Sequence, residues 1–466
     1  MCPNVLRLWA VFNLKWFCVY IVGAVIQTVC LPKVFATQEF MKKTLLYKIS
    51  SEKKLLIAWG KLNRANKPSH GIDNISIEDF GSNLEDKISS ISKKLRANTY
   101  KFSQNRAVLI PKSNGKFRPL QVPTISDRLV LKSIAIELEE QFLKTINKSL
   151  GLSFAYQKKL GVKDAIEKIK EHYDNDNKVV LEADLINFFG TVDKERLLNT
   201  QIFPNLSDDT LNTLINSALN QEIGGLDKLK QHERKEFEGL NTGIPQGNPL
   251  SPLLSNIYLS PFDMHLKDKG LLLVRYADDF VIMCKNEADC KSAYNESLEI
   301  LTKLDLKVHP LAENGKTKIV DLSKSTFNFL SITFDGTSFY PSIDNVDRLK
   351  SKIRDICNGK IDYNVLTLLK KVFNTFDGWV SAFYYTEVER YSEEIDYYIN
   401  RHLFLALRKF EWKFTPSSKG KVPSKYRNKN ESPDCLSDKQ RQKSGIPICN
   451  ELLTAKRNKK TSHKKS

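Results

Sequence analysis

The chain has 466 residues, of which 41% are hydrophobic and 10% aromatic, so it can bury the cores of two or three subdomains and is not disordered throughout. Its 72 Lys and Arg against 54 Asp and Glu give a net charge of +18, which attracts polyanions, most commonly nucleic acid and next anionic membranes. The eight cysteines form no C-x-x-C pair, so neither a zinc site nor a redox motif is indicated, and a reduced, cytoplasmic chain fits best.

The N-terminal stretch 8–35 is mostly apolar, with Lys15 and Lys33 as its charged residues. It is long enough for a membrane anchor, and residues 34–36 resemble a signal-peptide cleavage site. Alternatively, translation starts at Met41, because the recognisable motifs begin just after it. We favour this third interpretation, treat residues 1–40 as a hydrophobic extension outside the fold, and expect no membrane partner unless 8–35 is translated and inserted.

The first half of the chain alternates helical and extended patterns. Apolar spacing predicts helical stretches over 45–62 and 77–100. Short strands over 108–110 and 117–122 flank the turn signal Ser113-Asn114-Gly115, and helices follow over 127–142 and 162–172. A buried strand over 179–183 then delivers Asp184 at its end, and further helices begin at Asp193 and Asp208.

The second half begins with the clearest hairpin of the sequence, strands over 271–276 and 280–284 around the turn Ala277-Asp278. Strands over 318–321 and 327–334 follow, and then helices over 346–357, 363–385 and 388–410. This order predicts an α+β region with a helical module behind it. Residues 416–466 hold fourteen Lys and Arg and four Asp and Glu, a net of +10 out of +18, and predict a basic tail whose final stretch is solvated and disordered.

Three acidic residues, Asp184, Asp278 and Asp279, carry the clearest chemical meaning. Each alone is an ordinary turn residue, but the two apolar strands of VRYADDFVIM would bury everything except their acidic tip. Two Mg²⁺ ions that stabilise the attacking and leaving oxygens of a phosphoryl transfer need carboxylates from more than one element. The pattern therefore predicts a two-metal site.

From about Met41 to Phe410 the chain resembles bacterial reverse transcriptases of the group II intron-like kind, over several ordered blocks. The blocks are RAVLIPKSNGKFRP with VPTISDRLVLKSI, LEADLINFFGTVDKERL, TGIPQGNPLSPLLSNIY, YADD, NGKTKIV, FNFLSITF and FDGWVSAFYYTEVERYSEEIDYYINRHL. The resemblance implies an α+β right-hand polymerase fold. Fingers and palm with an antiparallel sheet would occupy 41–340, a helical thumb or maturase-like region 341–415, and the basic tail 416–466.

The resemblance also implies roles around the metal site. Asp184, Asp278 and Asp279 would bind two Mg²⁺ ions, or Mn²⁺ in their place, with the main-chain carbonyl of Leu185 as an extra ligand. Lys316 would act as general acid toward the pyrophosphate leaving group, although nearby lysines could substitute for it.

The remaining implied roles concern the substrates. Lys112 and Arg118 would hold the incoming triphosphate, although Lys112 also reads as a surface lysine beside a turn. Phe189 would lie beneath the sugar and exclude a 2′-OH, although it and Phe188 both read as core. Gln246 and Gly247 would approach the template, although PQG alone is only a turn before a helix. The sequence departs from the family pattern at two positions, Gly190 after the paired aromatics and Ser331 in the primer-grip block.

The implied activity is that of an RNA-directed DNA polymerase with an RNA template, a DNA or RNA primer and dNTPs as partners. We find no C-x-x-C or His-Asn nuclease pattern and no RNase H domain, which favours bacterial antiphage defence with a cognate noncoding RNA. The alternatives are a group II intron-encoded maturase that binds intron RNA for splicing and mobility, and a membrane-attached defence effector if 8–35 is translated. The sequence indicates neither the template nor the oligomeric state.

Overall fold

A computed structural model describes residues 44–62, 69–112, 115–240, 242–313, 315–359, 364–410 and 435–462. The predicted extension 1–40, Ser113 and Asn114 of the predicted turn, and part of the predicted tail, 416–434 and 463–466, lie outside the described residues. The chain falls into two compact units, Met1–Asn147 with Phe189–Tyr258 and Lys148–Phe188 with Leu259–Ser466. Among the described helices, none combines the length and the apolar character needed to cross a bilayer.

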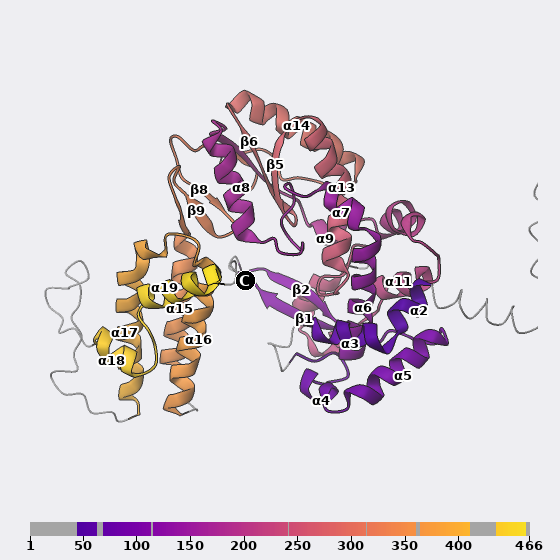
Figure 1. Cartoon of the computed structure of the whole chain (residues 1–466), viewed down its shortest axis with the longest axis horizontal. Coiled ribbons are helices and arrows are strands. Elements are labelled where there is room, and N and C mark those ends of the chain that lie inside the picture. The colour runs from indigo at the N-terminus through magenta and orange to yellow at the C-terminus, as the bar shows by residue number, and fades with distance from the viewer. Residues whose placement is uncertain are drawn as a thin grey trace, which may run out of the picture. The chain divides into compact units, whose positions relative to one another are not determined.

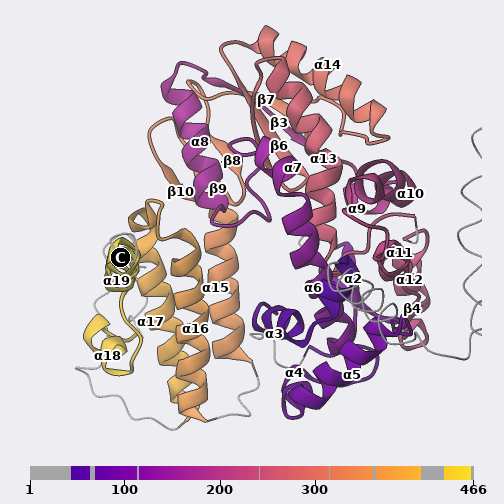
Figure 2. The same ribbon diagram turned by 45° about the vertical axis from the view of Figure 1, so that its right-hand side comes forward.

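The first unit is built around helix α6, Ile125–Gln141, with α2 and α3 packed along it (Figures 1 and 2). The helix begins at Thr124, whose side chain accepts a hydrogen bond from the amide of Asp127, as N-cap residues do. Lys54 on α3 pairs with the buried Glu137 carboxylate at 2.8 Å. The helices of this unit and its borders are α2 Leu45–Ser50, α3 Glu52–Gly60, α4 Ile77–Gly81, α5 Leu84–Arg96, α7 Leu143–Lys148, α9 Phe188–Thr191, α10 Lys194–Arg196, η1 Leu197–Ile202, η2 Phe203–Asn205, α11 Asn212–Leu219, η3 Leu226–Lys228, α12 Gln231–Arg234 and η4 Lys235–Phe237.

A small sheet in the first unit has the order β2-β1-β4. Strands β1, Asn105–Pro111, and β2, Phe117–Val122, form the predicted hairpin, with Ile110 opposite Arg118. The short strand β4, Ile223–Gly224, runs parallel to the start of β1. The hairpin prediction is confirmed, and its first strand is longer than predicted.

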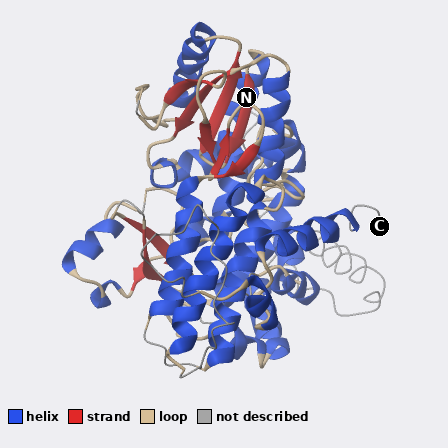
Figure 3. Ribbon diagram, turned by 90° about the vertical axis from the view of Figure 1, so that its left-hand side faces the viewer, coloured by secondary structure: helices blue, strands red, loops and turns tan. Residues whose placement is uncertain are grey.

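The second unit contains a four-stranded antiparallel sheet of order β5-β6-β3-β7, drawn in red in Figure 3. Its strands are β3 Val179–Asp184, β5 Leu272–Tyr276, β6 Asp279–Cys284 and β7 Lys318–Asp321. Helix α8, Val162–Asp174, packs against the apolar cluster that holds Val180, Val274 and Val281. Helix α14, Glu287–Lys303, follows β6, and helix α13, Ser251–Asp268, leads from the first unit into β5. The predicted hairpin around Ala277 and Asp278 and the predicted strand that ends at Asp184 are confirmed.

The prediction of one strand over 327–334 is wrong, because the chain turns back within it. Strands β8, Phe327–Phe329, and β9, Ile332–Phe334, pair around Leu330 and Ser331, and β10, Phe339–Pro341, adds to β9. Leu330 has φ +51° and Ser331 φ +70°, a backbone region that glycine and asparagine occupy far more readily. Because neither residue is a turn signal, the apolar pattern looked continuous.

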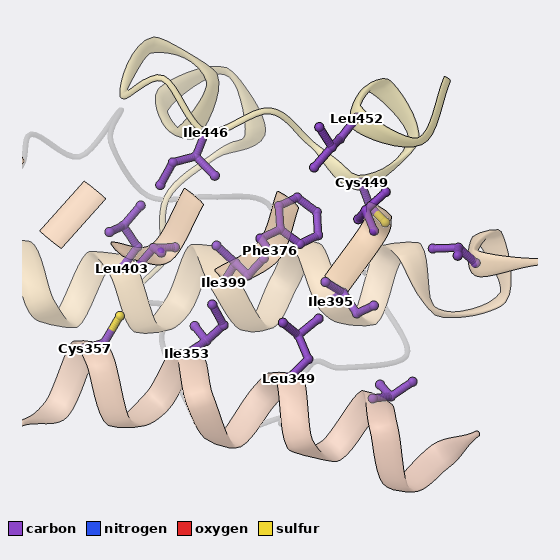
Figure 4. Close-up of a cluster of buried hydrophobic side chains, with 14 of the residues drawn as sticks. Leu349, Ile353, Cys357, Phe376, Ile395, Ile399, Leu403, Ile446, Cys449 and Leu452 are labelled. Atoms are coloured by element: carbon purple, nitrogen blue, oxygen red, sulfur yellow. The ribbon is translucent and has the colours of Figure 1, made fainter. Parts of the chain in front are cut away.

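The helical module consists of α15 Ile343–Asn358, α16 Val365–Phe383, η5 Val388–Tyr391, α17 Ser392–Arg408, α18 Asp438–Lys443 and α19 Cys449–Ser462. The expectation of a disordered final stretch is corrected over 435–462, where α18 and α19 complete this module. Ile446, Cys449 and Leu452 cover the apolar side chains of α16 and α17 (Figure 4). The buried Arg441 pairs with Asp396 of α17 at 2.7 Å. These contacts explain why a segment of basic composition folds.

Candidate active site

Asp184 and Asp279 lie directly opposite each other, at the ends of strands β3 and β6. Side chains that are paired in this way have Cβ atoms about 4.5–5.5 Å apart and point to the same face of the sheet. Glu182 shares this face with Asp184, because residues two apart on a strand point the same way. The sheet register therefore brings together acidic residues that are almost a hundred positions apart in the sequence.

Asp278 sits in the two-residue turn between β5 and β6, beside Ala277. Ala277 has φ +60°, a left-handed conformation that costs a non-glycine residue about 1–2 kcal/mol. Strained backbone of this kind persists only where its surroundings hold it, and it is found at functional sites. The turn presents Asp278 immediately next to the Asp184–Asp279 pair.

The electrostatics of the site reflect this crowding. The pKa of Asp279 is raised to about 7 by desolvation, and by the charges of Asp278, Asp184 and Glu182. Asp279 as a residue is exposed to solvent, and repulsion by the neighbouring carboxylates adds to the desolvation of its carboxyl group. The pKa of Glu182 is raised as well, by burial, while its partner Lys318 opposes the shift.

Lys316, one of the predicted site residues, forms an ion pair with Asp184. Its ammonium lies 2.5 Å from Oδ2 of Asp184 although its side chain is 65% exposed. His309 lies near the same oxygen, with Nε2 at 3.8 Å, and its amide donates to the Asp184 carbonyl at 3.1 Å. The prediction for this site missed His309, because no local pattern links it to β3. Leu185 is buried and pairs with Val308 in the same segment.

The donor set of the site fits a divalent cation. Three carboxylates on two neighbouring strands and a turn offer the hard oxygen ligands that Mg²⁺ and Mn²⁺ prefer. After desolvation, the charges of Asp278, Asp184 and Glu182 contribute to the raised pKa of Asp279. In the conformation observed, Asp184 pairs with Lys316, and within the described part of the chain no three His, Cys, Asp or Glu side chains form a ready-made metal cluster. Binding a cation there requires Lys316 to leave Asp184, which its exposure allows.

Lys112 and Arg118, the predicted triphosphate ligands, lie in the first unit on the β1–β2 hairpin. Both are exposed. The Lys112 amide donates to the Lys116 carbonyl at 2.7 Å, which continues the ladder past the end of β1. With Ile110 opposite Arg118, strand alternation puts Lys112, Lys116 and Arg118 on one face of the hairpin. The structure thus gathers three cations on that face.

Gln246 and Gly247 pack against strand β2. The Gln121 amide donates to the Gln246 carbonyl at 2.7 Å. Gly247 has φ +104°, and a Cβ on it would lie 2.7 Å from the Gln121 carbonyl oxygen. Only glycine fits this close approach, so a packing reason for Gly247 stands beside the predicted template contact. The side-chain oxygen of Gln246 is buried and accepts no hydrogen bond from any described group.

The two neighbouring phenylalanines differ in burial. Phe188 is 2% exposed and belongs to the core, whereas Phe189 is half-buried. The Phe189 carbonyl accepts from the Ile244 amide at 2.9 Å, and a Cβ on Gly243 would lie 2.0 Å from that carbonyl oxygen. Phe189 is therefore held at a fixed position beside the segment that contains Gln246.

Comparison with known proteins gives this site its context. Residues 110–334 match the family model described as reverse transcriptase (RNA-dependent DNA polymerase). The chain is 25% identical over 327 residues to protein YkfC of Escherichia coli, which covers 60% of this chain and 83% of that protein. It is 30% identical to a putative COX1/OXI3 intron 2 protein of Saccharomyces cerevisiae, over 50% of this chain and 25% of that protein. The group II intron-encoded protein LtrA of Lactococcus lactis is also 30% identical, over 38% of this chain and 28% of LtrA.

Solved structures match this chain with low TM-scores. A partial Cas6-RT-Cas1–Cas2 complex is 27% identical and covers 56% of this chain and 42% of that chain, with a TM-score of 0.34. Telomerase from Candida albicans is 16% identical, covers 74% and 67%, and has a TM-score of 0.35. The match covers about a quarter of the length of the yeast and lactococcal intron-encoded relatives. The family match and the ordered acidic residues lead to one conclusion: residues 110–334 of this chain carry a reverse transcriptase domain with a right-hand polymerase fold, and this domain is similar to that of group II intron-encoded proteins.

Proposed function

We propose that the whole chain is an RNA-directed DNA polymerase that copies an RNA template into cDNA, in the cytoplasm, with Asp184, Asp278 and Asp279 as its metal ligands. The observation that carries this proposal is the β3–β6 register, which sets Asp184 opposite Asp279 with Asp278 in the adjoining turn. The net charge of +18 suits an RNA–DNA substrate. The five described cysteines are all free thiols, in keeping with a reducing compartment.

The proposed roles of the side chains follow from their positions. Two divalent cations, when bound to the carboxylates, would stabilise the negative charge that develops on the attacking and leaving oxygens. Lys112 and Arg118 hold the triphosphate of the incoming nucleotide through charge-assisted hydrogen bonds. Lys316 is long and exposed enough to release Asp184 and donate a proton to the pyrophosphate.

Two further residues select the substrates. The half-buried ring of Phe189 lies against the sugar and leaves no room for a 2′-OH, and the Gln246 side chain donates to or accepts from the template nucleotide. The hydrogen bond that ties the Gln246 backbone to strand β2 supports the second role. The fixed backbone of Phe189 supports the first.

Primer extension on a defined RNA template, with dNTPs and Mg²⁺, tests the proposal. Wild-type protein should extend the primer, and Asp278→Ala should abolish incorporation while the affinity for the template–primer duplex stays within about threefold. Asp174→Ala, which removes an exposed carboxylate at the end of α8, is the matched control and should retain activity. Undiminished incorporation by Asp278→Ala would refute the site.

The biological setting that we propose is antiphage defence with a cognate noncoding RNA, which would supply the template. The group II maturase alternative is favoured by a specific observation, the similarity to the yeast and lactococcal intron proteins. Sequencing of the RNA that copurifies with the protein from its native host separates the two. A single short structured RNA encoded beside the protein supports the first setting, and intron RNA supports the second.

A further inference from the structure

Arg275, the residue before Tyr276 of the YADD motif, forms a buried ion pair with Asp263 of helix α13. Its Nε and Nη2 donate to the two Asp263 carboxylate oxygens, each at 2.6 Å. The side chains are 1% and 0% exposed. This is the bidentate arrangement in which the guanidinium fork matches a carboxylate, and a lysine cannot reproduce it.

The third arm of the same guanidinium supports the turn that carries the acidic residues. Nη1 of Arg275 donates to the carbonyl oxygen of Ala277 at 2.8 Å, and Ala277 is the residue with φ +60°. The backbone of Arg275 is held as well. Its amide donates to the Leu152 carbonyl at 2.7 Å, and its carbonyl accepts from the Phe154 amide at 2.9 Å. One residue therefore connects α13, the 152–154 segment and the strained turn.

Arg275 reaches the turn from the face of the sheet opposite to the acidic residues. Val274 belongs to the cluster that packs on α8, so the side chain of the next residue points to the other face. Asp279 shares the face of Val281, which is also in that cluster. The guanidinium thus lies behind the carboxylates, where it sets the geometry of the turn without standing among the ligands.

Energetics favour a geometric role for the pair over a stabilising one. A buried ion pair loses so much hydration that apolar residues of similar volume often serve stability equally well. What apolar residues cannot supply is the hydrogen bond to the Ala277 carbonyl. A left-handed alanine that lost this bond would relax toward commoner backbone angles, and a shift of about 1 Å at a catalytic group is costly.

We propose that Arg275, held in place by Asp263, is a positioning residue that fixes the Ala277–Asp278 turn so that the carboxylates keep the spacing needed for a divalent cation. This proposal rests on the carboxylate site of the proposed function. It assigns the α13–β5 pair a role in metal affinity, in addition to packing.

Binding of Mn²⁺ to the full chain without nucleic acid, followed by electron paramagnetic resonance, tests the proposal. The variants are Arg275→Lys, and the double variant Asp263→Leu with Arg275→Met, in which apolar side chains replace both charges. Arg441→Lys is the matched control, because Arg441 is equally buried, pairs with Asp396 at 2.7 Å and donates to main-chain carbonyls, but lies in the helical module. Amide hydrogen exchange of residues 277–279 gives a second readout.

The expected result is a dissociation constant for Mn²⁺ at least fivefold higher in both Arg275 variants, with faster exchange at 277–279 and no change in Arg441→Lys. Wild-type Mn²⁺ affinity in a folded Arg275→Lys or in the double variant would overturn the positioning role, and so would failure of both to fold. Asp278→Ala in the same titration distinguishes failure of the proposed carboxylate site from failure of the proposed role of Arg275. If Asp278→Ala binds Mn²⁺ like wild type, the proposed carboxylate site is wrong. If Asp278→Ala loses Mn²⁺ binding and the Arg275 variants do not, only the proposed role of Arg275 is wrong.

Discussion

Asp279 faces Asp184 across two neighbouring antiparallel strands, and its pKa is raised to about 7 by desolvation and by the carboxylates around it. The site therefore concentrates negative charge at one end of the four-stranded sheet. Such an arrangement serves a reaction that needs cations, and it costs stability when the carboxylates are ionised.

Asp279→Asn should stabilise the protein at pH 8 when no divalent cation is present. A carboxyl group whose folded pKa lies above its unfolded value contributes stability below about pH 4 and loses it as the pH rises through 7. After discounting for solvent screening, we expect a gain of about 1 kcal/mol, or about 2–4 °C in melting temperature, shrinking toward pH 4. Thermal unfolding at both pH values measures it, and an unchanged melting temperature at pH 8 contradicts the charge-crowding account. Incorporation of dNTPs should be lost.

Phe189→Ala should admit ribonucleotides. Removing the half-buried ring opens space for a 2′-OH, so the ratio of kcat/KM for dNTP to that for rNTP should fall at least about tenfold. The neighbouring Phe188→Ala is the control, since this buried ring should cost about 3–5 kcal/mol of stability without changing sugar selectivity. Equal selectivity in wild type and Phe189→Ala would exclude the ring as the gate.

Ser331→Gly should stabilise the β8–β9 turn. Ser331 is exposed with φ +70°, and relief of the left-handed strain outweighs the added entropy of glycine by about 0.5–1 kcal/mol. Thr326→Gly, an exposed position without a left-handed backbone, should destabilise by a similar amount. Denaturant titration of both variants decides, and a loss of stability in Ser331→Gly would show that the turn is not strained.

Leu453→Ala should destabilise the helical module by about 2–5 kcal/mol, because Leu453 on α19 is 2% exposed within the module core. Leu366→Ala, at a position on α16 that is 76% exposed, should stay within about 0.5 kcal/mol of wild type. If the two substitutions had equal effects on thermal unfolding, α19 would not be part of the core.

The sequence predicted those parts of the fold whose signals are local. Strands 117–122 and 318–321 were predicted with the bounds that the structure has, because alternation and a flanking turn mark them. The turn at Leu330 and Ser331 was missed because neither residue signals a left-handed backbone. Helix α19 was missed because eight polar or charged residues between 450 and 460 obscure the apolar positions that it buries.

The residues of the candidate site also fall into those that a local motif predicts and those that only tertiary structure brings together. The three aspartates and Lys316 were predicted from motifs, and in the structure the Lys316 ammonium contacts the Asp184 carboxylate. His309 and the Asp263–Arg275 pair depend on tertiary pairing between segments with no shared local pattern, so no reading of the sequence alone placed them. Their positions follow only from the strand register and the packing of α13.

The two C-terminal helices have a practical consequence for work with this protein. They seal the side of the helical module on which Phe376 and Ile399 lie (Figure 4). A proteolytic product that ends before Cys435 would retain every polymerase motif. It would also expose an apolar surface, which favours aggregation. Mass spectrometry of the full-length chain is therefore a better test of a preparation than detection of the YADD motif.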